Sequence, residues 1–211
     1  MPRSRDEGEN TLRSVKIPFG DGRSGSAPVR LDVDIFKWAD NGYCPETAAY
    51  VSRNHEGLHV RMVSHEKQTL ARTFEDNGPV WCDSCMEMFL RPFPDDERYI
   101  NFEINPAGAM VMDLHRTRKD KEELVSRYKR RLGLTVFSEA GNWGVDFTVP
   151  FAMLRQIYGG SCVPLAGDFL YANFYKCGDE TQTPHFGMWN EILSDKPDFH
   201  RPEFFGRLEL L

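Results

Sequence analysis

Strict alternation of side chains after Ser84 constrains the fold of this 211-residue chain more than any other feature. In an extended segment, alternate residues point to opposite faces, here Met86, Met88 and Leu90 on one face and Cys85, Glu87 and Phe89 on the other. Such a strand can bury one face in a core and leave Glu87 free for a ligand. Pro79 and Trp81, just before it, predict a turn and an aromatic ring at the sheet edge. The alternative is an ordinary amphipathic strand that Trp81 closes off.

The same alternation recurs along the chain and predicts a sheet-rich fold. The aromatic residues (12% of the chain) and the 30 residues that are Gly or Pro (17 + 13) suit strands joined by tight turns. We predict an all-β protein, an antiparallel β-sandwich of the jelly-roll or immunoglobulin-like type with one or two short inserted helices. The predicted strands cover residues 29–38, 48–52, 58–64, 84–90, 99–105, 109–116, 143–149, 169–176 and 204–211.

Two segments have helical features. Leu124, Tyr128 and Leu132 recur every four residues and predict a surface helix over 119–132, whose basic end at 127–131 is interpreted as solvated. Pro150 suits the first turn of a short helix over 151–158.

Three consecutive strands should form a meander with one apolar and one polar face. The residues from 84 to 116 are interrupted by turn sequences at 92–96 and 106–108. The polar face collects Glu87, Tyr99, Asn101, Glu103 and Asn105. This row should lie beside Trp81, so we expect the ligand site there.

Length and charge narrow the classes of protein to which the chain can belong. The length suits one domain: residues 28–211 form the sandwich, and residues 1–27 form a mobile segment with a possible edge strand over 15–19. A net charge of −6 argues against nucleic acid or an anionic membrane as the partner. No apolar run is long enough to cross a membrane, and no secretory signal is visible. We expect a cytoplasmic protein as given, secreted if a leader has been removed.

The cysteines do not predict a metal or disulfide framework. Their number is odd, their spacing is irregular, and we expect them to be reduced: Cys44, Cys82, Cys85, Cys162 and Cys177. Cys82 and Cys85 form a single C-x-x-C, but in an extended segment residues three apart point to opposite faces. We therefore predict no metal site from the residues themselves.

Several motifs occur in an order that resembles a known family. They are the residues from Trp81 to Phe89, the segment Tyr99–Gly108, the segment Trp143–Phe151, the segment Asn173–Lys176, Trp189, and the closing His200–Leu208. Together they resemble the family 9 carbohydrate-binding modules, in particular their stand-alone bacterial branch with a DOMON-like β-sandwich. The resemblance runs from about Val29 to the C-terminus. It implies a non-catalytic domain that holds the end of a sugar chain between two tryptophans, which by motif position are Trp81 and Trp189. The family also makes a bound calcium ion possible, although no dense aspartate loop is present.

The chemistry of a sugar agrees with these residue types. A flat indole can cover an apolar C–H face of a pyranose, while carboxylates and amides bind its rim of hydroxyls. The ligand is predicted to be a mono- or oligosaccharide, bound with roughly micromolar to millimolar affinity because water competes for every hydroxyl. The predicted ligand-binding residues are Trp81, Glu87, Asn101, Glu103, Asn173, Lys176 and Trp189, with no catalytic residue. Trp38 and Trp143 are interpreted as core residues.

Three alternatives remain open at this point. Glu87 and Glu103 could be the acid and base of a glycosidase, which would require a deep pocket and one raised pKa. Haem could bind through Met and His, although the alternation of Met86, Met88, Met110 and Met112 indicates packing. The aromatic residues could also contact a protein partner. The residues do not identify the sugar, its linkage or any protein partner.

Overall fold

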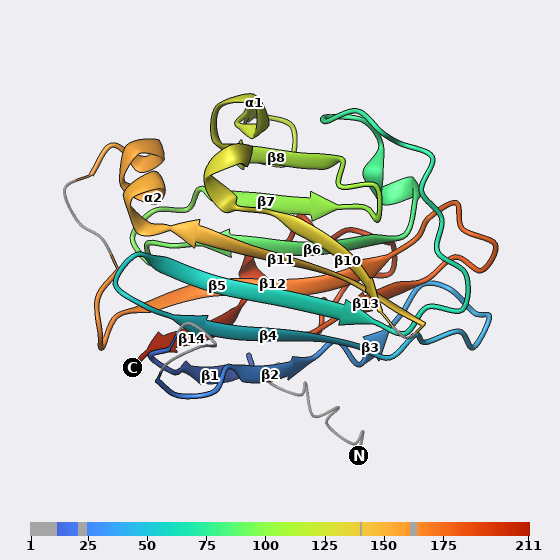
Figure 1. The fold of residues 1–211 in the computed structure, drawn as a ribbon, viewed down its shortest axis with the longest axis horizontal. Helices are drawn as coiled ribbons and strands as arrows, with labels where there is room; N and C mark the ends of the chain where they lie inside the picture. The colour runs from blue at the N-terminus through green and yellow to red at the C-terminus, as the bar shows by residue number, and fades with distance from the viewer. Residues whose placement is uncertain (1–11, 21–24, 140, 161–163) are drawn as a thin grey trace, which may run out of the picture.

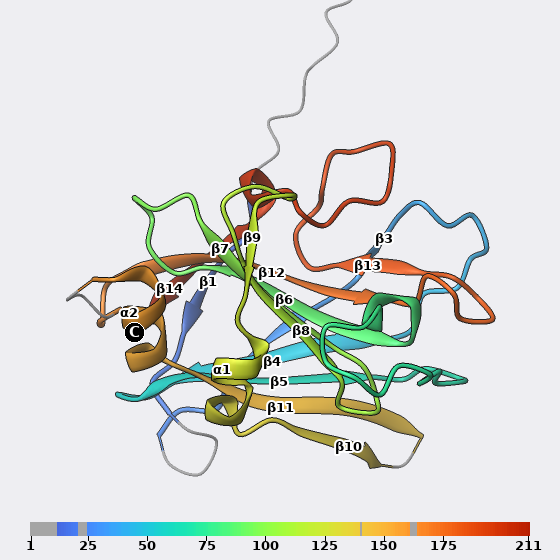
Figure 2. The same ribbon diagram turned by 90° about the horizontal axis from the view of Figure 1, so that it is seen from above.

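Two sheets packed face to face form the protein, as the computed structural model of residues 12–20, 25–139, 141–160 and 164–211 shows (Figures 1 and 2). The larger sheet has the path β1-β14-β12-β6-β7-β8-β9, with β13 on β12 and β3 on β13. The smaller sheet has the order β10-β11-β5-β4-β2. This is the predicted β-sandwich, and apart from the parallel pair β1–β14 its strand pairs are antiparallel.

The larger sheet consists of β1 (Ser14–Ile17), β3 (Ile35–Phe36), β6 (Cys85–Arg91), β7 (Tyr99–Ile104), β8 (Met110–His115), β9 (Lys121–Glu123), β12 (Phe169–Cys177), β13 (Phe186–Met188) and β14 (Gly206–Leu210). The smaller sheet consists of β2 (Val29–Asp32), β4 (Thr47–Arg53), β5 (Gly57–Ser64), β10 (Thr135–Glu139) and β11 (Asn142–Pro150). The helices are α1 (Val125–Tyr128) and α2 (Phe151–Tyr158), with 3-10 turns η1 (Val80–Cys82), η2 (Lys129–Leu132) and η3 (Pro202–Phe204). No described helix is long and apolar enough to span a membrane.

The core lies between the two sheets, where their apolar faces meet. The four alternating methionines of β6 and β8 are all buried in it, together with Trp143. This confirms that these methionines pack the interior. Side chains packed between the two sheets do not serve as axial ligands of a haem. Trp38, interpreted as core, is only half-buried, and it packs against Phe186 and Phe199 on the outer side of the larger sheet.

The predicted strands 48–52 and 58–64 form a hairpin, and residues 84–116 form the predicted meander. Strands β4 and β5 are joined through the turn before Gly57, where Asn54 Oδ1 accepts the backbone N–H groups of residues 56 and 57. In the meander, Glu87 of β6 pairs with Glu103 of β7, and Asn101 of β7 pairs with Asp113 of β8. The polar side chains of three strands therefore share the outer face of the larger sheet.

The first and last described strands meet at one edge of the larger sheet. The early strand predicted near residues 15–19 is β1, which pairs with β14 in parallel register at the edge. The C-terminal strand, predicted over 204–211, thus lies beside this early strand. Residues 1–11 and 21–24 of the segment expected to be mobile lie outside the described residues.

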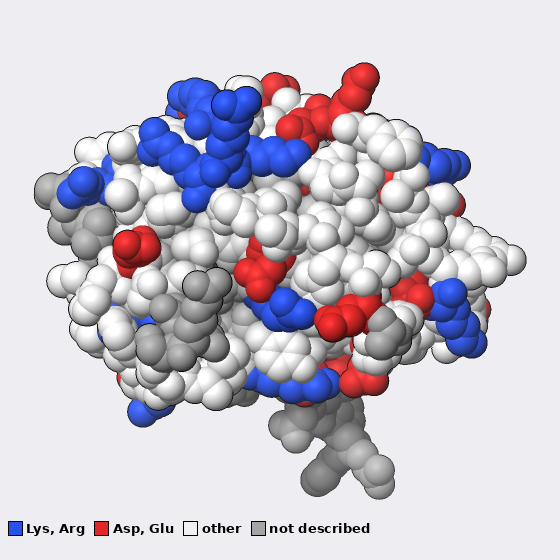
Figure 3. All heavy atoms as spheres, viewed as in Figure 1, with Lys and Arg blue, Asp and Glu red and all other residues white. Residues whose placement is uncertain are grey.

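Two predicted elements were wrong in detail. Residues 29–38 are not one strand, because the chain leaves the smaller sheet after β2 and joins the larger sheet as β3 against β13. Residues 119–132 are not one helix: Lys121 and Glu123 pair with β8 as β9, and only the short α1 and η2 follow. Pairing with the exposed edge of β8 outweighs the helical spacing of the leucines. The basic side chains of 127–131 gather over α1 and the turn after it (Figure 3).

Candidate ligand-binding site

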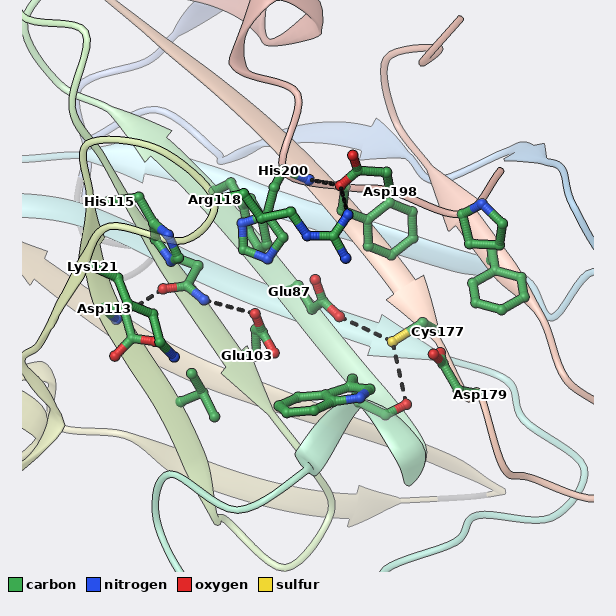
Figure 4. A pocket seen from close by; sticks show the side chains of 17 residues that line it. Glu87, Glu103, Asp113, His115, Arg118, Lys121, Cys177, Asp179, Asp198 and His200 are labelled. Atoms are coloured by element: carbon green, nitrogen blue, oxygen red, sulfur yellow. Dashed lines mark hydrogen bonds and ion pairs between the residues drawn. The ribbon is translucent and has the colours of Figure 1, made fainter. Parts of the chain in front are cut away.

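A pocket of about 300 Å³ lies on the outer face of the larger sheet (Figure 4). Its floor is formed by β6, β7 and β8, and its walls come from η1, the loop after β8, the start of the loop after β12 and the segment before η3. Four of the seven predicted ligand-binding residues line it: Trp81, Glu87, Asn101 and Glu103. The meander therefore brings Trp81 together with three residues of the predicted polar row, whereas Tyr99 and Asn105 do not line the pocket.

Trp81 supplies an exposed aromatic surface on a firmly held turn. Its side chain is 41% exposed, and its backbone carbonyl accepts a hydrogen bond from the N–H of Asp179 at 3.1 Å. The turn η1 ends at the buried Asp83, whose Oδ2 accepts the N–H groups of Arg72 and Thr73 and the side-chain amide of Asn105. An indole on such a rigid support can cover a flat apolar ligand without a large entropic cost.

Glu87 and Glu103 lie side by side on the pocket floor, and both are almost completely buried. Glu103 Oε1 accepts the amide of Asn101 at 2.7 Å, and Glu87 Oε1 accepts the thiol of Cys177 at 3.0 Å. Burial raises the pKa of Glu103 to about 7 and that of Glu87 well above its ordinary value, and the Glu103 charge raises the latter further. Both carboxyl groups therefore keep their protons to a higher pH than an ordinary glutamate does.

Ionic groups complete one wall of the pocket. Asp113 Oδ2 pairs with Nζ of Lys121 at 2.7 Å, and Asp198 pairs with Arg118 at 3.0 Å. The second oxygen of Asp113, Oδ1, is buried and has no hydrogen-bond partner in the described part of the protein. A buried acceptor without a donor is costly, so a ligand that donates a hydrogen bond here would be favoured.

Much of the remaining lining is aromatic, and Tyr99, which is not part of it, contacts the imidazoles of both His115 and His200. Tyr99 and His115 stack with centroids 4.9 Å apart, and the hydroxyl of Tyr99 lies 2.9 Å from Nδ1 of His200. Burial lowers the pKa of His200 to about 3 and also lowers that of His115, so both imidazoles are neutral near pH 7. They present aromatic surface and neutral nitrogen atoms to a ligand. Phe186 and Phe199 add further apolar lining.

The structure corrects the expected position of Trp189. Its side chain is only 4% exposed and packs in the core between the sheets, with the ring of Phe174 at 6.0 Å and the backbone of Gly206 beside it. Its backbone N–H donates to the carbonyl of Phe174, which directs the ring inward from the end of β13. A slot between Trp81 and Trp189 therefore does not form.

Asn173 and Lys176 also lie outside the pocket. The amide of Asn173 is fully buried, where Nδ2 donates to the carbonyl of Asn190 and Oδ1 accepts the N–H of Asn190. Lys176 faces the interior and pairs with Glu66. The structure therefore places both predicted residues in the interior, away from the pocket.

The pocket also contains residues that the sequence reasoning missed. The strand over 109–116 was predicted, and its period of two places Val111, Asp113 and His115 on one face, so extending the polar row by one strand would have found them. Lys121 was missed because the sequence analysis assigned it to a helix and not to the strand β9. Asp179, Asp198 and Phe199 lie on loops, where no local periodicity marks them.

One group of side chains in the described residues could hold a metal ion. The donor atoms of Cys85, Glu87 and Cys177 lie within 4.8 Å of one another, and all three residues are buried. Cys82, the other residue of the C-x-x-C, is not among them. Thiolates are soft ligands and calcium prefers oxygen, so this group does not favour calcium.

A sandwich with a polar pocket on the outer face of one sheet has the architecture of a ligand-binding module. The sequence profile described as "Carbohydrate-binding family 9" matches residues 27–210. The chain therefore belongs to carbohydrate-binding family 9. Proteins of this family are non-catalytic binding domains.

Solved structures share the fold. A protein from Bacteroides uniformis that has been proposed to bind carbohydrate is 27% identical, with a TM-score of 0.79 over 95% of this chain and 100% of that one. A family 9 module from Caldicellulosiruptor kristjanssonii in complex with glucose is 12% identical, with a TM-score of 0.64 over 94% of this chain and 96% of that one. The complex of a family 9 module from the same organism with cellotriose is 11% identical, with a TM-score of 0.66 over 94% and 93% of the two chains. Among curated proteins, none matches this chain.

Proposed function

We propose that this protein binds a mono- or oligosaccharide, without catalysis, in the pocket between Trp81 and the polar row of β6, β7 and β8. The observation that carries the proposal is the exposed indole of Trp81 beside buried carboxylates and an amide in one pocket. Membership of the family supports it. Glucose and cellotriose, the ligands of the Caldicellulosiruptor modules, are the first sugars to try.

Different residues of the pocket would bind different parts of the sugar. The indole of Trp81 would cover one C–H face of the sugar, in place of the two-tryptophan slot. Glu87, Glu103 and Asp113 would accept hydrogen bonds from hydroxyls, because each has an oxygen facing the pocket or without a partner. Each such hydrogen bond contributes only about 0.5–1.5 kcal/mol net, so micromolar to millimolar affinity is expected.

The position of the two acids argues against a glycosidase, although both are buried with raised pKa values. Hydrolysis needs carboxyl groups that flank the scissile bond. Glu87 and Glu103 occupy paired positions on the same face of one sheet, so they approach a bound sugar from the same side. Accordingly, aryl glycosides should bind without being cleaved.

The test is calorimetric titration with glucose, cellotriose and a panel of other mono- and oligosaccharides. Trp81→Ala should reduce affinity at least tenfold, because a stacked aromatic ring contributes a large share of the contact in such a site. Phe74→Ala is the matched control: Phe74 is 77% exposed but does not line the pocket, and its loss should leave affinity unchanged. Failure of the whole panel to bind, or full affinity in Trp81→Ala, would contradict the proposal.

A further inference from the structure

The charges in the pocket do not balance. Five carboxylates line it, against two basic side chains: Glu87, Glu103, Asp113, Asp179 and Asp198 face only Arg118 and Lys121. Both cations are already engaged, Lys121 with Asp113 and Arg118 with Asp198. Among the residues that the structure describes, Glu87, Glu103 and Asp179 have no basic partner. The buried Lys176 lies nearby, but it is paired with Glu66 at 3.1 Å.

Direct pairing makes this imbalance acute at Glu87 and Glu103. When both are ionised, they place like charges at paired positions of neighbouring antiparallel strands, which destabilises the sheet, and both side chains are at least 95% buried. The hydrogen bonds they accept, from a neutral amide and a thiol, bring no positive charge. A cation that enters the pocket would relieve this repulsion.

A second, independent observation also points to a ligand with several donors. Asp113 is only 1% exposed and lines the pocket, yet its Oδ1 has no hydrogen-bond partner among the described residues. Asn101 connects the two places: its Nδ2 donates to Glu103, and its Oδ1 accepts the N–H of Asp113. The acceptors thus form one continuous row across β6, β7 and β8 (Figure 4).

We propose that the sugar this pocket prefers is a hexosamine with a free amino group, whose ammonium is held by Glu87 and Glu103 while a hydroxyl donates to Asp113. This inference rests on the proposed sugar binding and names the class of sugar. An ammonium has three donors and no acceptor, which matches a row of carboxylates better than a neutral hydroxyl does. An N-acetylated sugar has lost that charge and would not gain the ion pairs.

Protonation gives the proposal a distinctive consequence. Acids and neutral side chains surround Glu87 and Glu103, and among the described residues the only cations facing them are already paired. The acids are Asp113 of β8, Asp179 after β12 and Asp198 before η3; the neutral groups are His115, Tyr175, Cys177 and His200; and the paired cations are Arg118 and Lys121. Because Glu103 has a pKa of about 7, part of the population is protonated at pH 7. An arriving ammonium favours the charged carboxylates, so binding should release protons.

The first experiment compares sugars that differ at one substituent. Glucosamine and galactosamine are titrated by calorimetry at pH 7.0 beside glucose, galactose and N-acetylglucosamine. We expect at least one hexosamine to bind tenfold or more tightly than its neutral parent and than N-acetylglucosamine, because hydrogen bonds to charged groups are worth more than neutral ones. Titrations in two buffers of different ionisation enthalpy should show that the hexosamine releases protons and that glucose does not.

Variants then identify the acids. Glu103→Gln and Glu87→Gln should each weaken hexosamine binding much more than glucose binding, because the amide cannot form the ion pair, so most of the preference for the hexosamine is lost. Glu139→Gln is the matched control, because Glu139 is exposed at the end of β10 in the other sheet. Thermal unfolding of each variant confirms that it is folded.

The outcomes separate the two proposals. Equal affinity for hexosamines and their neutral parents, or a preference that survives both Gln variants, overturns the hexosamine inference and leaves sugar binding in place. Binding of neither kind of sugar removes the proposed function and the inference with it.

Discussion

Nζ of Lys176 lies 3.1 Å from Oε2 of Glu66, and both side chains are buried to within 1%. Oε2 of Glu66 also accepts the indole N–H of Trp143 at 2.9 Å, while Oε1 accepts the hydroxyl of Ser84 at 2.8 Å. The ammonium additionally contacts the carbonyl of Cys177 and Nε2 of His185, each at 2.8 Å. The lysine that the sequence suggested as a sugar contact therefore ties the two sheets together.

Lys176→Met should accordingly lower the stability of the fold and leave the affinity of the folded protein for sugar unchanged. Removing one partner leaves the carboxylate of Glu66 buried without its counter-charge, and a loss of about 3–5 kcal/mol in the free energy of unfolding is expected. Lys16→Met, at an exposed position of β1, is the control and should change stability by less than about 0.5 kcal/mol. Urea denaturation measures both. A variant with wild-type stability but weakened sugar binding would contradict this assignment.

The two tryptophans that the sequence placed together should separate by experiment. Trp189→Ala empties a core position and should cost about 3–5 kcal/mol of stability. Trp81→Ala removes a ring that is 41% exposed and should cost far less while weakening ligand binding. A Cβ at Gly206 would lie 2.3 Å from the ring of Trp189, so Gly206→Ala should destabilise as well. Denaturation midpoints and titrations of the three variants test this pattern, which a loss of affinity in folded Trp189→Ala would contradict.

The thiols should differ sharply in reactivity. Burial raises the pKa of Cys85 to about 12, and the hydrogen bond with Cys85, together with burial, raises the pKa of Cys177. Because the thiolate is the nucleophile, iodoacetamide should label the exposed Cys44 in the folded protein and reach the two buried thiols only after unfolding. Peptide mapping by mass spectrometry in the presence and absence of urea measures this. Rapid labelling of Cys85 in the native protein would show that the strands open there. Cys162 lies outside the described residues.

The parts of the site that could be predicted are those set by patterns between near neighbours in the sequence. The alternation of β6 and β7 is local, so it was sufficient by itself to place Glu87, Asn101 and Glu103 on one face. Their nearness to Trp81 followed from chain continuity through η1. The same argument applied to β8 would have added Asp113.

The errors came from segments where local pattern carries little information. Strand β13 is three residues long, too short for alternation to show whether Trp189 beyond it turns in or out. The direction is decided by its pairing with the preceding strand β12, a contact that the alternation within β13 does not contain. Lys121 was assigned to a helix because of the four-residue spacing of Leu124, Tyr128 and Leu132. That spacing contains no information about the edge of β8, with which Lys121 pairs. Loop residues such as Phe199 reach the pocket only through tertiary structure.

The raised pKa of Glu103 predicts how stability depends on pH. Burial is the largest cause, the charge of Asp113 adds to it, and the amide of Asn101 and the charge of Lys121 oppose it. With a folded pKa of about 7 and an ordinary value of 4.5, the folded protein holds this proton after the unfolded chain has lost it. Stability from this group therefore falls as pH rises from about 4.5 to about 7, by up to about 1.4 kcal/mol per pH unit, and is constant above and below that window.

Other groups also make stability depend on pH. The pKa values of His115 and His200 are lowered, so their contribution to stability rises with pH below about 6.5. Comparing Glu103→Gln with the wild type isolates the contribution of Glu103, because both proteins contain these histidines. A neutral amide cannot ionise, so the stability of the variant relative to the wild type should increase from pH 5 to pH 7 and then level off by pH 8. Urea unfolding at pH 5, 6, 7 and 8 gives the difference at each point, and Glu139→Gln should give a flat difference. A flat difference for Glu103→Gln too would mean that the carboxyl is solvated and ionises normally, which would also remove the repulsion that favours a cationic ligand.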